Sequence, residues 1–261
     1  MKIRHEIWLC VLCAPAMAAG LCPRPLSVGW DQWPPFHYRT TQGRMAGYAV
    51  EVLNAAAQRL GCTLEYRQTP WPRTLQQLQT GQLDIAMQAL KTPARERFAW
   101  FASGYSPTFI RFWARAERVD RWKVRRLEDI GRLGPLTLGV TRGDSFGPQL
   151  DAWLRAPPAN VRVEVGGELE GNLRKLQLGR VDLLLASGNA ARGILSGLPA
   201  KPAVAPLALS WYVGDAYFVF SRGSVPEPLF RAFDGALREM KRDGTLPAIY
   251  RRNFAEAYPV D

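Results

Sequence analysis

Strand-like and helix-like stretches alternate along this chain in two successive series, and this alternation limits the folds open to it. The first series predicts strands and helices at 26–30, 47–60, 63–67, 71–80 and 83–87. The second predicts strands at 136–141, 161–165 and 181–186, with helical stretches after Arg142–Ser145 and at 173–178. Strands that alternate with helices in this way predict mostly parallel sheets covered by helices.

The C-terminal part of the chain extends this pattern. A strand at 217–220 is followed by helical patterns at 226–241 and 246–254. Two series with a returning tail predict an α/β fold of two lobes, each a mostly parallel sheet flanked by helices, with the chain crossing between them twice. We expect lobe 1 at 19–107, lobe 2 at 108–215, and a return to lobe 1 at 216–261.

The first 18 residues have a different character. Lys2 and Arg4 precede a short apolar stretch at 7–14, and Ala16-Met17-Ala18 follows as a cleavage pattern. A basic start, a short apolar region and small residues at the cut are typical of a secretory signal peptide, and the apolar region is too short for a membrane anchor. We therefore expect export to the periplasm and a mature chain that begins near Ala19.

Removing this leader leaves two cysteines, Cys22 and Cys62. An even pair in an exported protein predicts one disulfide, with two buried thiols as the alternative. Each cysteine stands just before a predicted strand, at 26–30 and 63–67. If these strands are parallel neighbours, both cysteines lie at the same end of the sheet, as a bridge requires.

Composition excludes several classes of protein. The 261 residues are 47% hydrophobic and 22% charged, with a net charge of +11, which is ordinary for a globular chain apart from its basic balance. The densest basic stretch, 115–126, carries no helix-turn-helix, zinc or RNA-binding signature, so no nucleic-acid partner is expected. One histidine after the leader, His37, and the absence of metal-binding or Walker motifs predict no metal and no cofactor.

Ligands of open α/β sheets bind outside the carboxyl ends of the strands. The positions that follow the predicted strands therefore hold the candidate site, at 30–36, 88–95, 141–145 and Ser187.

Several motifs occur in a fixed order through the chain. They include Trp33-Pro34-Pro35-Phe36, Gly47-Tyr48-x-Val50-Glu51, Thr92-Pro93-x-Arg95, Gly179-Arg180-Val181-Asp182 and Asp243-Gly244-Thr245-Leu246. Each is weak alone, but in this order and spacing the chain resembles the family 3 extracellular solute-binding proteins, the periplasmic receptors of polar amino-acid importers. The resemblance spans nearly all of the mature chain.

The resemblance implies two lobes that close on a ligand by hinge bending, with crossings near 105–110 and 212–217. It implies that Arg95 binds the ligand's carboxylate, for which a planar, permanently charged guanidinium is suited. It places Trp33 and Trp71 around the ligand and makes the loop 142–145 an anion cradle of backbone N–H groups. The alternatives are an Arg95 paired locally with Glu96 or Asp84, and tryptophans that pack in the core.

Two positions depart from the family pattern. Family members that bind α-amino acids hold the ammonium with an Asp five residues after the Asp of Gly-Arg-x-Asp, where this chain has Ser187. A family Thr five residues before the arginine corresponds to Leu90 here. Asp144 or Asp215 are candidates to replace the missing charge. The predicted ligand-binding set is Trp30, Trp33, Phe36, Trp71, Gln88, Leu90, Arg95, Thr141, Arg142, Gly143, Asp144, Ser145, Ser187 and Asp215.

Enzyme functions receive less support. Gly143-Asp144-Ser145-Phe146-Gly147 matches a nucleophile elbow, but the histidine of such hydrolases follows the serine, whereas His37 precedes it. We therefore expect a non-enzymatic receptor that captures a small polar, carboxylate-bearing solute for an ABC permease. The alternatives are a cyclohexadienyl dehydratase-like enzyme, with Glu51 or Asp144 as its acid, and a ligand sensor on the same fold.

Overall fold

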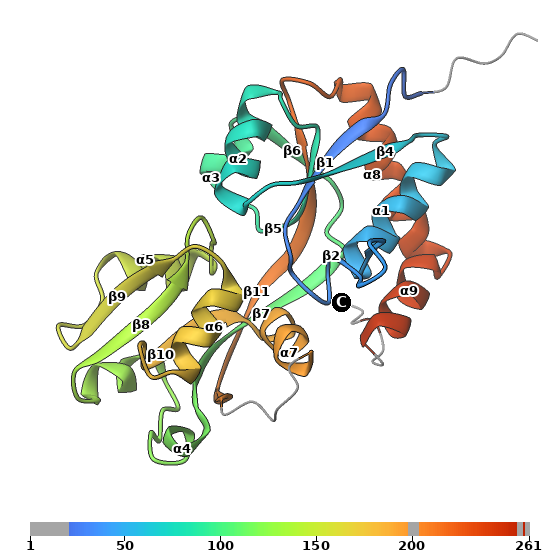
Figure 1. The fold of residues 1–261 in the computed structure, drawn as a ribbon. Coiled ribbons are helices and arrows are strands. Elements are labelled where there is room, and N and C mark those ends of the chain that lie inside the picture. Colours follow the sequence, from blue (N-terminus) through green and yellow to red (C-terminus); the bar gives the residue numbers. More distant parts are fainter. Residues whose placement is uncertain (1–20, 198–203, 255–257, 259–261) are drawn as a thin grey trace, which may run out of the picture.

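The computed structural model describes residues 21–197, 204–254 and 258, so the predicted leader lies outside the described residues. Within these ranges, no helix combines the length and the apolar character needed to cross a membrane. Figure 1 shows two groups of helices and strands joined by two long strands. The predicted two-lobed α/β fold is confirmed.

Lobe 1 is built from both ends of the described chain. Its elements are β1 (Leu26–Trp30), β2 (Tyr38–Arg39), β3 (Met45–Ala46), α1 (Tyr48–Arg59), β4 (Leu64–Gln68), α2 (Trp71–Thr80), β5 (Ile85–Ala89), α3 (Pro93–Glu96), β6 (Ala99–Phe101), α8 (Glu227–Arg242) and α9 (Thr245–Phe254). Strands β4, β1 and β5 lie side by side in parallel, as predicted.

Lobe 2 is formed by the middle of the chain. Its elements are α4 (Ala116–Val119), a 3-10 helix at Leu127–Arg132, β8 (Leu136–Thr141), α5 (Pro148–Arg155), β9 (Val161–Gly166), α6 (Leu169–Gln177), β10 (Leu183–Ser187) and α7 (Gly188–Ser196). Strands β10, β8 and β9 are parallel neighbours.

Two strands cross between the lobes, β7 (Ser106–Arg115) and β11 (Val204–Ser221). They pair with each other antiparallel as far as Ala216 opposite Ser106. Beyond that point β11 pairs with β5 and β6 of lobe 1, while β7 continues beside β10 of lobe 2. The two crossings therefore lie next to each other at one place in the fold (Figure 1).

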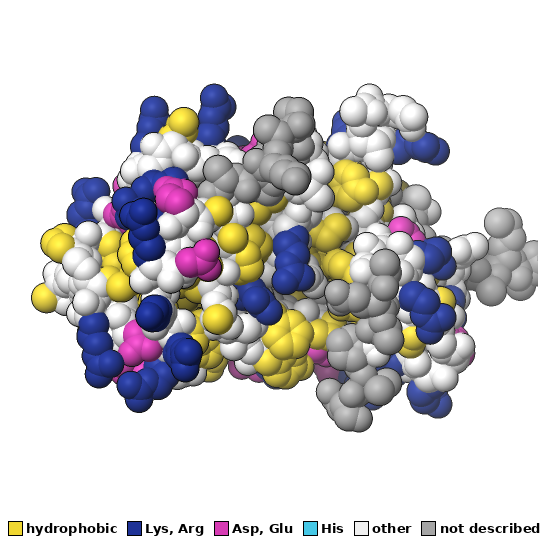
Figure 2. Space-filling view, turned by 90° about the horizontal axis from the view of Figure 1, so that it is seen from below, with side chains coloured by type: hydrophobic (Ala, Val, Ile, Leu, Met, Phe, Trp, Pro, Cys, Tyr) yellow, Lys and Arg dark blue, Asp and Glu magenta, His cyan; other side chains and the backbone are white. Residues whose placement is uncertain are grey.

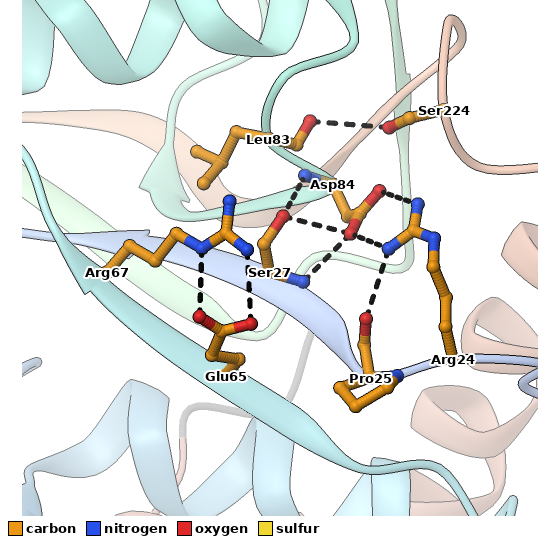
Figure 3. Close-up of polar contacts among 8 residues, drawn as sticks. All are labelled: Arg24, Pro25, Ser27, Glu65, Arg67, Leu83, Asp84 and Ser224. Atoms are coloured by element: carbon orange, nitrogen blue, oxygen red, sulfur yellow. Dashed lines mark hydrogen bonds and ion pairs between the residues drawn. The ribbon is translucent and has the colours of Figure 1, made fainter.

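Lobe 1 is tied together at the amino end of its parallel strands. The predicted disulfide is confirmed: Cys22 and Cys62 are bonded, with their Cα atoms 5.3 Å apart, just before the paired strands β1 and β4. Nearby, the carboxylate of Asp84 accepts hydrogen bonds from the backbone N–H of Ser27 at 2.8 Å and from both terminal nitrogens of Arg24 (Figure 3). Burial favours the neutral acid, but these hydrogen bonds outweigh it and lower the pKa of Asp84 to about 2.

Apolar side chains form the cores of the lobes. One cluster lies wholly in lobe 2 and includes Phe112, Leu138 and Leu183. A larger cluster fills the space between the lobe 1 sheet and helices α1, α8 and α9, and continues into α6 and α7 of lobe 2. Basic side chains are spread over the surface of the face shown in Figure 2, with few acidic ones among them.

Candidate ligand-binding site

A cavity lies between the two lobes. It contains about 510 Å³ of space free of protein atoms, part of it open to solvent. Its walls come from lobe 1, from lobe 2 and from the two crossing strands. The lining residues are Trp33, Phe36, Trp71, Gln88, Leu90, Arg95, Thr108, Ile110, Asp144, Ser145, Phe146, Ser187 and Ala216.

A second, smaller cavity of about 380 Å³ shares Trp33, Trp71 and Asp144 with the first. Its remaining lining residues are Asp31, Gln32, Thr141, Gly167, Glu168 and Leu169. Three of its side chains carry carboxyl groups, so this part of the cleft is acidic, whereas the larger cavity contains Arg95.

Arg95 lies in the short helix α3 and is only 7% exposed. One terminal nitrogen donates a hydrogen bond to the carbonyl of Leu90 at 2.7 Å, and the other donates across the cleft to the carbonyl of Gly143 at 2.8 Å. Two of the five N–H groups of the guanidinium are thus used. Burial lowers the pKa of Arg95, and the charges of Asp144 and Asp151 oppose this shift.

The predicted alternative, an Arg95 paired with a local acid, is wrong. Glu96 forms an ion pair with Lys91 at 2.9 Å, and Asp84 is occupied by Arg24 at 2.7 Å. Both acids are therefore neutralised elsewhere, and the guanidinium of Arg95 points into the cleft.

Aromatic side chains form part of the wall of the larger cavity. Trp71 is the first residue of α2, and its indole N–H donates to the carbonyl of Gly143 at 3.0 Å. The guanidinium carbon of Arg95 lies 5.4 Å from the centre of the Trp71 ring. Trp33 packs edge-on against Phe36, with ring centres 6.0 Å apart. The Gly143 carbonyl thus binds two donors of lobe 1 and holds the lobes together.

In the loop 142–145 after β8, the predicted anion cradle, some of the backbone N–H groups are bound within lobe 2. The backbone N–H of Arg142 donates to the carbonyl of Gly166, and that of Asp144 to the carbonyl of Thr141. The N–H of Phe146 is bound by the carboxylate of Asp151, which also accepts from the Ser145 hydroxyl at 2.6 Å.

These three N–H groups are bound inside lobe 2, in the segment that precedes α5 at Pro148. The loop therefore offers lobe 1 a carbonyl, from Gly143, and the carboxyl group of Asp144.

Two carboxyl groups in the cleft have altered acidity. Burial raises the pKa of Asp144 to about 7; the charge of Arg95 opposes this shift and those of Asp31 and Asp151 add to it. Burial also raises the pKa of Asp31 and lowers that of His37, whose Nδ1 lies 3.0 Å from the Asp31 backbone carbonyl oxygen. Since its pKa is near neutrality, Asp144 can donate as well as accept a hydrogen bond in this cleft.

Most of the predicted site residues come together here, and four line neither cavity: Trp30, Arg142, Gly143 and Asp215. Trp30 is 2% exposed and packs in the core of lobe 1, because alternate side chains of β1 point to opposite faces of the sheet. Arg142 is exposed at the surface of its loop. Asp215 lies on β11 with one carboxylate oxygen 3.8 Å from Lys241.

Sequence reasoning missed other lining residues. Thr108, Ile110 and Ala216 line the larger cavity from the crossing strands. The rule that ligands bind at the carboxyl ends of parallel strands does not apply to these antiparallel strands. Gly167, Glu168 and Leu169 follow the carboxyl end of β9, so that rule could have found them.

Two α/β lobes, joined by adjacent crossing strands and enclosing a polar and aromatic cavity, define a solute-binding protein. The model of the bacterial extracellular solute-binding proteins, family 3, matches residues 26–256. The chain belongs to this family.

Relatives support the same assignment. The chain is 25% identical over 230 residues to the probable amino-acid-binding protein YxeM of Bacillus subtilis, covering 87% of this chain and 82% of the relative. It is 35% identical over 72 residues to the cyclohexadienyl dehydratase of Pseudomonas aeruginosa, covering 27% of each. Its fold matches an ancestral arginine-binding protein bound to arginine, with a TM-score of 0.75 and 24% identity over 88% of this chain and 98% of that structure.

Proposed function

We propose that this protein is the periplasmic receptor of an ABC importer and that it captures a small, carboxylate-bearing, amino-acid-like solute between its lobes. The observation that carries the proposal is the buried Arg95 in the wall of the cleft. Three N–H groups of its guanidinium find no acceptor among the described residues, which leaves them for the oxygen atoms of a ligand.

The aromatic walls support a solute of amino-acid size. Trp33, Phe36 and Trp71 line the larger cavity beside Arg95, and a few polar groups among aromatic walls are typical of small-molecule sites. The flat rings can cover the apolar part of such a solute while Arg95 binds its charged end.

Contacts to both lobes support capture by closure. A ligand shifts the balance between open and closed forms only if it binds the closed form more tightly. A solute in this cavity contacts Arg95 and Gln88 of lobe 1 together with Asp144 and Ser145 of lobe 2. We infer a hinge at Ser106 and Ala216, where the pairing of β7 with β11 ends. These two strands are the described chain connections between the lobes, so bending at this point would move one lobe relative to the other.

The family and the disulfide support export and delivery to a permease. The family consists of extracellular proteins, and the Cys22–Cys62 bridge fits an oxidising compartment such as the periplasm. The similarity to an amino-acid-binding relative supports delivery of an amino-acid-like solute to a permease.

A thermal-shift screen of amino acids, polyamines, opines and dicarboxylates tests the proposal, because a ligand that binds only the folded protein raises its melting temperature. Calorimetry of the best ligand then compares wild type with Arg95→Ala and with Arg97→Ala, an exposed neighbour outside the cavity. We expect about 100-fold weaker binding for Arg95→Ala and no change for Arg97→Ala. Undiminished binding by Arg95→Ala would overturn the role of Arg95.

A dehydratase is the second candidate, and Asp144 favours it. Glu51, the other predicted acid, accepts hydrogen bonds from Arg252 and Asn253 outside the cleft. Asp144 lines the cavity with its pKa raised to about 7 by burial, which suits a general acid. Incubation with prephenate separates the two functions: loss of water and carbon dioxide to give phenylpyruvate with wild type, but not with Asp144→Asn, would establish an enzyme.

A further inference from the structure

Asp144 brings a carboxyl group of lobe 2 to the boundary between the lobes. It is partly buried and lines both cavities of the cleft. The carbonyl of its neighbour Gly143 accepts hydrogen bonds from Trp71 and Arg95 of lobe 1. The carboxylate of Asp144 itself forms no hydrogen bond and no ion pair with the residues that the structure describes. A carboxylate in this position loses water without gaining a partner, which favours the neutral acid.

The charged groups that face Asp144 come from both lobes. They are Arg95 of α3, Asp31 after β1 with His37 beside it, Glu168 before α6, and Asp151 of α5. Three of them are acids, and the guanidinium already donates to two carbonyl oxygens. Burial lowers the pKa of His37, so it adds no positive charge at neutral pH. The exposed Arg142 of the same loop is screened by water. An ionised Asp144 thus lies among more negative than positive charges.

Opening of the cleft would change the surroundings of Asp144. Burial is the largest cause that raises its pKa to about 7, and part of its cover comes from Trp33 and Trp71 of lobe 1. The attraction of Arg95 and the repulsion of Asp31 act in opposite directions, and separation of the lobes weakens both. The net change therefore follows burial. In an open cleft water reaches the carboxyl group, and its pKa returns toward about 4.

We propose that closure of the lobes takes up a proton on the carboxyl group of Asp144, so that the ligand-free protein closes more readily as the pH falls. The inference rests on the hinge motion of the proposed function, but it requires no ligand. Between about pH 4 and pH 7 the closed form binds more protons than the open form. The closed form therefore loses stability relative to the open form as the pH rises through this window, with no further change above it.

Titration of Asp144 in the closed and the open form tests the inference. Gly193→Trp holds the cleft open, because a Cβ atom at this position of α7 would lie 2.5 Å from Pro35 of lobe 1. Gly171→Trp is the matched control, since a Cβ atom at this exposed position of α6 would meet no other element within 4 Å. Carbon-13 shifts of the carboxyl group, assigned with Asp144→Asn, give the pKa. We expect about 7 in wild type and in Gly171→Trp, and about 4 in Gly193→Trp.

Spin labels on the two lobes measure closure directly. Gln79→Cys in α2 and Gln149→Cys in α5 place labels at exposed positions on opposite lobes. We expect the ratio of open to closed molecules to rise at least about tenfold between pH 5 and pH 8, and to stay constant in Asp144→Asn. Glu168→Gln should keep the dependence of wild type, because Glu168 is exposed to water. A label pair within lobe 1, at Gln58 and Gln79, controls for changes in the fold.

The outcomes separate this inference from the proposed function. Equal pKa values for Asp144 in wild type and Gly193→Trp would overturn the inference alone. So would an interlobe distance that does not change with pH, or one whose pH dependence persists in Asp144→Asn. Interlobe distances that respond neither to pH nor to any member of the thermal-shift screen would overturn hinge closure, and both proposals with it. The label measurements do not depend on Gly193→Trp, so they test the inference even if that variant fails to fold.

Discussion

Each lobe joins two strands of its sheet through an aspartate that binds a backbone N–H and an arginine, but the two aspartates are buried to different extents. In lobe 1, Asp84 precedes β5 and binds the backbone N–H of Ser27 in β1 together with Arg24. In lobe 2, Asp182 precedes β10 and binds the backbone N–H of Thr137 in β8 together with Arg118. The side chain of Asp84 is 2% exposed, whereas that of Asp182 is 24% exposed.

This difference indicates that lobe 1 is the stiffer half of the site. Its sheet has the more deeply buried contact and the disulfide as well, and it supplies Arg95 and Gln88 from fixed positions. Lobe 2 contributes a loop that carries Asp144. Four predictions test whether lobe 1 is the stiffer half of the site and how the loop of lobe 2 contributes.

The largest effect is expected from removing the disulfide with Cys22→Ser and Cys62→Ser together. The bridge joins residues 40 positions apart, so its loss should reduce the free energy of unfolding by about 3–4 kcal/mol. Urea denaturation followed by tryptophan fluorescence measures this change. Ligand affinity should stay constant at low denaturant, because neither cysteine lines a cavity. An unchanged midpoint would show that lobe 1 does not depend on the bridge.

Asp84→Ala and Asp182→Ala form a matched pair across the lobes. We expect Asp84→Ala to lower the free energy of unfolding by about 3 kcal/mol, because it leaves the buried N–H of Ser27 without an acceptor. Asp182→Ala should cost about 1 kcal/mol, since its site is more exposed and water can replace the carboxylate. Equal losses in denaturation experiments would contradict the difference between the lobes.

Asp144 should make the protein less stable as the pH rises. Its pKa is raised to about 7 in the folded protein, so the folded state binds more protons than the unfolded state between about pH 4 and pH 7. Stability attributable to this group therefore falls across that window and is constant above it.

Asp144→Asn tests this dependence. Relative to wild type, the variant should gain about 1–2 kcal/mol at pH 8 and nothing at pH 4. Melting temperatures at both pH values provide the measurement. A gain that is the same at both would mean that ionisation of Asp144 has no part in it.

The smallest effect is expected from Trp71→Phe, which keeps a ring in the cavity wall and removes the hydrogen bond to Gly143. One hydrogen bond between the lobes corresponds to about a fivefold loss of ligand affinity. Trp100→Phe is the control, because Trp100 stacks on Phe230 away from the cavity. Equal affinity of both variants in calorimetry would remove Trp71 from the contacts that hold the lobes closed.

Much of the fold could be predicted because its signals are local. Strand β1 and helix α2 have the predicted bounds, and α2 ends where Gly81 adopts the left-handed conformation with a φ of +73°. The disulfide could be predicted from the placement of both cysteines before parallel strands.

Elements that depend on distant contacts were harder to predict. The sequence indicated a strand only at 217–220, whereas β11 extends from Val204 to Ser221. Its first part is largely apolar but contains Pro206, and its register with β7 shifts twice, so it lacks the regular pattern of a strand. Helix α7 was not predicted.

The same limit applies to the site. Arg95 stands in a motif that sequence can identify, but the raised pKa of Asp144 depends on burial between the lobes and on charges from both, Arg95 and Asp31 of lobe 1 and Asp151 of lobe 2. The sequence pattern of one segment does not reveal that a distant segment will bury its side chains.

Gly193 shows how little room the closed cleft leaves. It lies in α7 of lobe 2, where a Cβ atom would come within 2.5 Å of Pro35 and 2.6 Å of the backbone carbonyl oxygen of Pro34 in lobe 1. A larger side chain at this position would collide with Pro34 and Pro35 and hold the two lobes apart. The lobes can therefore approach each other this closely only if residue 193 is a glycine.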